Sequence, residues 1–161
     1  MGNVVKIGIA DMHIVSAPDS VMTIGLGSCV GIAIWDKSRK LGGLIHIMLP
    51  DSNAVKSNTN KLKFADSGIV ALINEMEQKG CRRASLIAKI AGGAQMFTFQ
   101  NKSDLLGVGL RNVDAVRSTL KDLGIPILAE DVGENFGRTV EFYPENGVYC
   151  VRAVGKPDKM L

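Results

Sequence analysis

The sequence predicts an α+β fold, with a central β-sandwich of mixed sheets and helices packed outside it. Strand-like segments occur at both ends of the 161-residue chain, and only two segments show helical periodicity. The two kinds of segment do not alternate as a doubly wound sheet requires. The length corresponds to roughly one domain. No repeat or linker-like stretch divides the chain, so we expect a single domain over residues 1–161 with a flexible tail at about 155–161.

The first half of the chain is predicted to consist mainly of strands. Four segments have strand composition or are short apolar runs: Val4–Ala10, Met22–Ile24, Val30–Trp35 and Leu41–Leu49. The last two should pair as a hairpin around Lys37-Ser38. No Asn-Gly or Asp-Gly is present to fix the type of this turn.

The second half contains the two predicted helices. Their apolar positions recur at helical spacing: Ile69, Leu72, Ile73 and Met76 in the first, and Val113, Val116, Leu120 and Leu123 in the second. Asp66 or Ser67 is the expected N-cap of the first helix and Asn112 that of the second, while Gly80 and Gly124 should end them. Four short strands complete the prediction: Leu86–Ala88, Ile127–Ala129, Thr139–Phe142 and Val148–Val151.

Composition and charge exclude several classes of protein. A net charge of +3 is too mild and too evenly spread to predict nucleic acid or an anionic membrane as partner. No apolar run approaches the roughly 18 residues of a membrane span, and the start of the chain does not resemble a signal peptide. Three cysteines are too few for a disulfide framework. We therefore expect a cytoplasmic protein.

Cys29 is the first candidate for chemistry. It follows the glycine-containing segment Thr23–Ser28 and begins a predicted buried strand. Glycines let the backbone turn sharply and approach a ligand, and free N–H groups at Gly27 and Ser28 could bind a developing oxyanion. The alternative is that Cys29 is a small apolar packing residue. Cys81 and Cys150 are interpreted as packing residues.

His46 is the candidate partner of this thiol. A hairpin loop centred on Lys37-Ser38 pairs residues whose numbers add to 75, which places Cys29 opposite His46. Directly opposed Cβ atoms lie about 4.5–5.5 Å apart, as a thiolate–imidazolium pair needs. A core histidine with its own partner is the alternative. A third group usually orients the ring, and Thr23 is a candidate together with Ser28, Asp36 and Asp51.

No motif for a metal or a nucleotide cofactor is found. Gly92-Gly93 follows a predicted strand, but no Gly-Lys-Ser/Thr sequence comes after it and no dinucleotide-binding fingerprint is present. No pair of cysteines or histidines has the spacing of metal ligands. We expect neither a cofactor nor a metal.

The segment Thr23–Val30, together with His46–Ser52, resembles the CheD family of chemoreceptor glutamine deamidases. The resemblance extends from about residue 4 to about residue 153. Further segments resemble the family in order and spacing: Lys63–Asp66, Ala88–Phe97, Gly109–Asn112, Ala129–Gly133 and Gly137-Arg138. Two positions depart from the usual pattern, because Phe64 stands where tyrosine is common and Glu134 where a second glycine is usual.

The resemblance implies hydrolysis of glutamine side-chain amides on the cytoplasmic domains of methyl-accepting chemotaxis receptors, giving glutamate and ammonia. It implies Cys29 as nucleophile, His46 as acid and base, and Thr23 as the orienting hydroxyl. It also implies a fold similar to deamidases of the cytotoxic necrotizing factor type, association with membrane-bound receptor arrays, and binding to the phosphatase CheC, which is linked to CheY. The alternatives are a protein that acts chiefly as a binding regulator of CheC and, less favoured, another cysteine hydrolase such as a peptidase.

Overall fold

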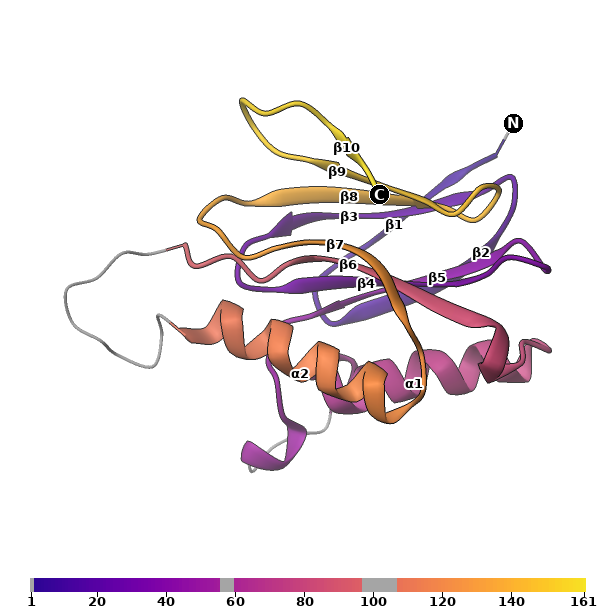
Figure 1. Cartoon of the computed structure of the whole chain (residues 1–161), viewed down its shortest axis with the longest axis horizontal. Helices are drawn as coiled ribbons and strands as arrows, with labels where there is room; N and C mark the ends of the chain where they lie inside the picture. The colour runs from indigo at the N-terminus through magenta and orange to yellow at the C-terminus, as the bar shows by residue number, and fades with distance from the viewer. Residues whose placement is uncertain (1, 56–59, 97–106) are drawn as a thin grey trace.

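The computed structural model describes residues 2–55, 60–96 and 107–161. Two five-stranded sheets are stacked face to face, and two α-helices cover the outer face of one sheet (Figure 1). The elements in chain order are β1 (Val4–Ile7), β2 (Asp11–Ser16), β3 (Ser20–Leu26), β4 (Val30–Asp36), β5 (Leu41–Ile47), α1 (Ala65–Gln78), β6 (Leu86–Gly92), α2 (Val108–Asp122), β7 (Ile127–Val132), β8 (Arg138–Tyr143), β9 (Val148–Arg152) and β10 (Lys159–Met160), with short 3₁₀ helices at Ser52–Ala54, Lys61–Lys63 and Arg83–Ser85.

The strand order is β1-β3-β8-β9-β10 in the first sheet and β2-β5-β4-β6-β7 in the second. Each sheet contains one parallel pair, β1 with β3 and β6 with β7, and its other pairs are antiparallel. Both sheets are therefore mixed. The predicted α+β sandwich with helices outside is confirmed.

The central strands of the second sheet are buried on both faces. One face packs against the helices, and its inner face packs against the first sheet. Every residue of β4 and β5 is buried, which explains why these strands are continuous apolar runs instead of alternating ones. The helix stripes predicted from Ile69 and Val113 onward form the helical side of the outer core.

The hairpin between β4 and β5 differs from the prediction by two positions. Its last pair is Asp36 with Leu41, so the loop is Lys37–Lys40 and the paired residue numbers add to 77. Gly31, and not Cys29, lies opposite His46. Asp36 closes the loop by accepting hydrogen bonds from the Ser38 hydroxyl and the Arg39 N–H. Because side chains in a strand alternate with a period of two, this shift leaves every side chain on its predicted face.

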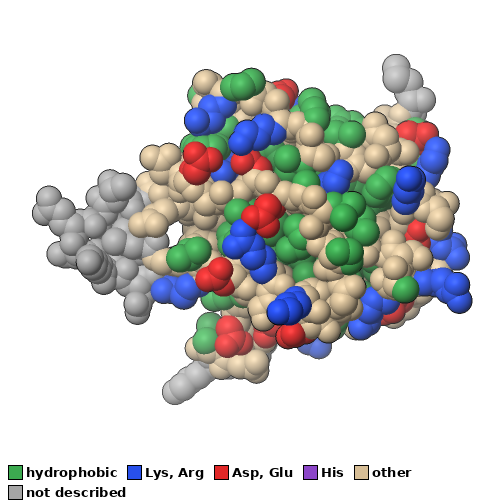
Figure 2. Space-filling view, in the orientation of Figure 1, with side chains coloured by type: hydrophobic (Ala, Val, Ile, Leu, Met, Phe, Trp, Pro, Cys, Tyr) green, Lys and Arg blue, Asp and Glu red, His purple; other side chains and the backbone are tan. Residues whose placement is uncertain are grey.

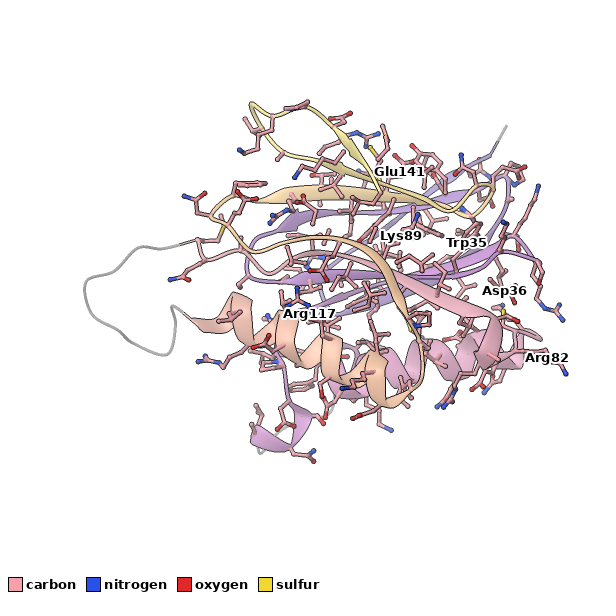
Figure 3. All side chains as sticks on the ribbon, in the orientation of Figure 1. Trp35, Asp36, Arg82, Lys89, Arg117 and Glu141 are labelled. Atoms are coloured by element: carbon pink, nitrogen blue, oxygen red, sulfur yellow. The ribbon has the colours of Figure 1, made fainter. Side chains whose placement is uncertain are left out.

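Two strands were not predicted from the sequence. β2 lies at an edge of the second sheet, where the chain reverses after β1 instead of continuing to Ala10. β10 pairs with β9, and the backbone of Leu161 exchanges two hydrogen bonds with Tyr149. Lys89 Nζ also donates a hydrogen bond to the Leu161 carbonyl at 2.9 Å, so the segment 155–161 contacts the sheet, and its predicted flexibility stays a prediction. Figure 3 shows Lys89 emerging from the sheet region near this end of the chain.

The helix ends agree only in part with the predictions. Gly80 and Gly124 follow the helices with positive φ, as expected of terminating glycines. The predicted N-caps are wrong: Phe64 caps α1 without a side-chain bond, and α2 begins after Gly107. Asn112 lies inside α2 and is fully buried.

The two departures from the family pattern have different surroundings. Phe64 is fully buried beside Leu49, with which it forms a β-bridge. Glu134 has a φ of 59°, a left-handed conformation that glycine adopts more easily, which explains why glycine is the usual residue there. Phe97, the last residue of one resembling segment, lies outside the described residues.

Candidate active site

Thr23 and His46 meet in the interior between the two sheets. Thr23 belongs to β3 of the first sheet and His46 to β5 of the second, and both side chains are fully buried. Thr23 Oγ1 and His46 Nδ1 are 2.7 Å apart. The structure therefore places Thr23, the predicted orienting residue, against the histidine, and the contact joins the two layers of the sandwich.

A β-bulge in β3 shapes the backbone between this threonine and the cysteine loop. Thr23 pairs with Val140 and Leu26 pairs with Arg138. The second pair is three residues further along β3 but only two residues away on β8, so β3 contains one extra residue. Gly25 lies inside the bulge with a φ of 79°. The extra residue lets both Thr23 and Leu26 face the interior, although regular alternation would place them on opposite faces.

The hydrogen bonds of Thr23 define the tautomer of His46. The hydroxyl of Thr23 donates to the carbonyl of Ile7 at 3.0 Å. A hydroxyl has one hydrogen, so Oγ1 must accept from Nδ1–H of the ring. Nε2 then carries the lone pair, and it has no hydrogen-bond partner among the described residues. The buried imidazole therefore presents an unprotonated nitrogen that can accept a proton.

Cys29 lies just before β4, in the loop between β3 and β4, and is partly exposed. It packs against the core between the sheets, which is the face on which His46 lies. Gly31 is the residue opposite His46, so Cys29 is its diagonal neighbour. Diagonal neighbours are about 7–8 Å apart, still within reach of a long or aromatic side chain. In the described atoms, no hydrogen bond joins the thiol to Nε2.

The carbonyls of the cysteine loop are held by three separate donors. Ala94 N–H donates to Gly27 O and Gly93 N–H to Cys29 O, both at 2.8 Å. The Asn112 amide donates to Ser28 O, also at 2.8 Å. Because these bonds fix its peptide units, the loop holds its N–H groups in defined orientations. Among the described residues, the N–H of Ser28 has no acceptor.

Gly92 and Gly93 make this anchoring possible. Their φ angles are 112° and 67°, and a Cβ atom at Gly92 would lie 2.3 Å from the Cys29 carbonyl oxygen. Only glycine allows such a close approach of the two backbones. The paired glycines that do not fit a phosphate-binding loop therefore support the cysteine loop.

Burial sets the protonation of the candidate pair. It raises the pKa of the Cys29 thiol, and a hydrogen bond from the residue's own N–H opposes this only in part. It lowers the pKa of His46 to about 4. The resting pair is therefore a neutral thiol and a neutral imidazole.

These directions predict a particular pH dependence of thiol alkylation by iodoacetamide. Only the thiolate reacts, so the Cys29 rate constant should keep rising through about pH 9 and reach no plateau near neutrality. The neutral imidazole should persist down to about pH 4. Intact-mass measurements would follow the labelling, with the Cys29→Ala variant reporting any labelling of Cys81 and Cys150. A plateau below pH 7 would contradict a neutral resting pair.

The other candidate residues lie elsewhere or have other partners. Asp36 is at the far end of β4 from Cys29 (Figure 3), and Asp51 caps the 3₁₀ helix at Ser52–Ala54. Neither orients His46. Cys81 is buried and hydrogen-bonded to Asp36, which together raise its pKa to about 11. Cys150 is buried in β9.

Two residues contribute to the site without having been predicted as site residues. Ile7 contributes a backbone carbonyl, and Asn112 contributes its side chain from α2. The Ile7 carbonyl completes the chain to Thr23 and His46, and a carbonyl leaves no mark in the sequence. The sequence predicts Asn112 as a helix cap, but its amide bridges two loops. Within residues 2–55, 60–96 and 107–161, no cluster of three or more potential metal ligands is present.

Comparisons with known proteins agree on one family. The family model described as "CheD chemotactic sensory transduction" matches residues 48–153. A Lachnoclostridium phytofermentans protein named "Probable chemoreceptor glutamine deamidase CheD" is 52% identical, and the alignment covers 100% of each chain. The "Chemoreceptor glutamine deamidase CheD" of Halalkalibacterium halodurans is 48% identical, again with 100% of each chain covered.

Among solved structures, the chain is similar to the crystal structure of the Bacillus licheniformis hypothetical protein YfiH. The two are 18% identical, the TM-score is 0.47, and the match covers 75% of this chain and 49% of that one.

Proposed function

Because the chain belongs to the CheD family, whose curated members are named chemoreceptor glutamine deamidases, we propose that it hydrolyses glutamine side chains of chemoreceptors to glutamate and ammonia. Cys29 is the nucleophile, His46 the acid and base, and Thr23 the residue that orients the ring. The observation that carries this mechanism is the hydrogen-bonded chain from Ile7 through Thr23 to His46, because it leaves Nε2 free to accept a proton.

The first half of the reaction forms a thioester. His46 Nε2 takes the proton of the Cys29 thiol as the sulfur attacks Cδ of the glutamine. The substrate oxygen becomes an oxyanion, and backbone N–H groups at Gly27 and Ser28 are its proposed donors. Ser28 is the better supported of the two, because the Gly27 N–H already donates to Gly25 O at 3.1 Å. The imidazolium then gives its proton to the departing nitrogen, and ammonia leaves.

The second half returns the enzyme to its starting state. His46 Nε2 removes a proton from water, and the resulting hydroxide attacks the thioester carbonyl. The carbon–sulfur bond breaks, the thiolate regains its proton from the imidazolium, and glutamate is released. Nδ1–H donates to Thr23 throughout, so a single nitrogen carries all the proton transfers.

Incubation of the full chain with a receptor cytoplasmic fragment tests the activity. Each conversion of glutamine to glutamate adds about 1 Da to a peptide and releases one ammonia. Peptide mass spectrometry should locate the conversions at particular glutamines, and coupled detection of ammonia should give the same stoichiometry. Cleavage of the fragment's backbone, with no change at its glutamines, would instead favour a peptidase.

Thr23→Val tests the orienting role. Valine keeps the branched shape but can neither accept from Nδ1–H nor donate to Ile7, so the ring loses its fixed tautomer. We expect kcat to fall by about 10- to 100-fold with little change in KM. Steady-state ammonia release would measure both constants, and Thr139→Val, at a β8 position next to Val140, is the matched control. An unchanged kcat in Thr23→Val would assign the orienting role elsewhere.

We also propose that the chain works as one deamidase domain in the cytoplasm, reaches receptor arrays through the receptors, and binds CheC. The core shared by the two sheets supports the single domain. No helix in the described part of the chain is long and apolar enough to cross a membrane. The face shown in Figure 2 carries intermingled acidic and basic side chains.

The similarity of this fold to deamidases of the cytotoxic necrotizing factor type stays a prediction.

Regulation of CheC is the second proposed role. Titrating CheC phosphatase activity with the Cys29→Ala variant separates it from catalysis, because a binding regulator keeps its effect without the thiol. Loss of the effect together with the thiol would favour deamidation as the sole role.

A further inference from the structure

Asn112 is the only polar residue among the buried side chains of α2. Its Nδ2 donates two hydrogen bonds, to Ser28 O at 2.8 Å and to Met48 O at 3.0 Å. Ser28 immediately precedes the proposed nucleophile, and Met48 lies two residues after His46. One amide group therefore holds the backbones of the two segments that supply the reacting side chains.

The chemistry of the contact requires an amide. Both partners are carbonyl oxygens, so the group between them must supply two N–H donors from one nitrogen, as the NH₂ of asparagine does. The same requirement defines which way the amide is turned. A carboxylate of the same shape would place negative charge against two carbonyl dipoles, and leucine would leave both carbonyls without this donor.

The surroundings keep Asn112 from adapting. Gly109, one turn earlier on the same face of α2, lies so close to Gly93 that a Cβ atom there would be 2.6 Å from the Gly93 carbonyl oxygen. A Cβ atom on Gly93 would lie 2.2 Å from Val113. Helix α2 thus packs directly against Gly93, whose N–H holds the Cys29 carbonyl. From this helix, Asn112 also binds Met48, which follows the His46 strand.

We propose that Asn112 is a positioning residue for the deamidation reaction, acting by setting the distance between the Cys29 loop and the end of the His46 strand. The inference rests on the proposed catalytic roles of Cys29 and His46. The hydrogen bonds of the Asn112 side chain are made to the carbonyls of Ser28 and Met48 and not to the Cys29 thiol or His46 Nε2. The thiol and Nε2 are not hydrogen-bonded in the resting structure, so small shifts of either backbone change how readily the proton transfer geometry is reached.

Asn112→Leu, which keeps the volume but removes both donors, is the first test. We expect kcat for ammonia release from a receptor fragment to fall by about 100-fold while KM stays within about twofold. Val116→Ala is the matched control, because Val116 is buried one turn further along α2 and its truncation weakens packing without touching either loop. It should lower the melting temperature and keep the wild-type kcat. A kcat for Asn112→Leu within twofold of wild type overturns the proposal.

Asn112→Asp gives a second readout, with kcat calculated per folded molecule at each pH because a buried carboxyl also makes stability depend on pH. The ionised carboxylate repels both carbonyls, whereas the protonated acid donates one hydrogen bond. The kcat of this variant should therefore rise as the pH falls from about 8 to 5.5, while the wild type stays nearly flat over that range. This test decides the matter if the leucine variant does not fold, and a flat profile for Asn112→Asp overturns the proposal.

Cys29→Ala is measured alongside these variants. If it retains ammonia release, the catalytic assignment fails; if it is inactive while Asn112→Leu is fully active, only the role of Asn112 fails.

Discussion

Replacing Cys29 with alanine should abolish ammonia release from a receptor cytoplasmic fragment and leave the fold intact. No other group at the site can form the thioester, because Cys81 and Cys150 are buried in other parts of the structure. Loss of a nucleophile that works together with its base lowers kcat by on the order of 10⁴-fold or more. Cys29 is partly exposed at the start of a strand, so removing its sulfur creates little cavity.

Cys150→Ala is the matched control for this result. The same atom is removed from a buried position in β9, so some stability should be lost while the kcat of the folded protein is retained. Circular dichroism would confirm that both variants are folded, and a coupled assay would follow ammonia. Undiminished release by Cys29→Ala would remove the thiol from the mechanism.

Replacing His46 with asparagine should lower kcat by at least about 10³-fold. Asparagine can still bond to Thr23, but it has no basic nitrogen to replace Nε2, the atom that the present tautomer leaves free. Because nucleophile and base act as a unit, the double variant with Cys29→Ala should be no slower than Cys29→Ala alone. Steady-state ammonia release at pH 7.5 measures each rate.

His13 provides the control, since it is the other histidine of the chain and is exposed on β2. His13→Asn should keep wild-type kcat. If His46→Asn were as active as His13→Asn, a different group would have to supply the base.

The architecture could be predicted from the sequence because buried positions are apolar and recur at the spacing of a strand or a helix. Strands β4 and β5 are fully buried and read as continuous apolar runs, while α1 and α2 each bury one stripe. Edge elements leave a weaker record, and β2 and β10 were missed because they are short or half exposed. The N-cap predictions failed for a related reason. Asn112 has the right residue type for a cap, but α2 begins four residues earlier, at Val108, and tertiary packing buries Asn112 inside the helix.

The site shows the same division. The glycine-containing loop, the thiol and the distant histidine were all recognisable, and the face of each strand survived a register error of two residues because side chains alternate with a period of two. The hairpin turn has no residue pair that fixes its type, so its length depended on Asp36 binding the loop. With this longer loop, the residue opposite His46 is Gly31 and not Cys29 as predicted.

Residue type and local periodicity predict the sandwich class, the helical stripes and the candidates Cys29 and His46, whereas Thr23 is separated from the other orienting candidates only by the family resemblance. How these side chains contact one another depends on the tertiary structure. The β3 bulge and the carbonyl of Ile7 come from the first sheet, and the amide of Asn112 comes from the helical layer; together they fix the histidine tautomer and hold the cysteine loop. Backbone carbonyls are the same in every residue, so only the fold can specify which of them meets a given side chain.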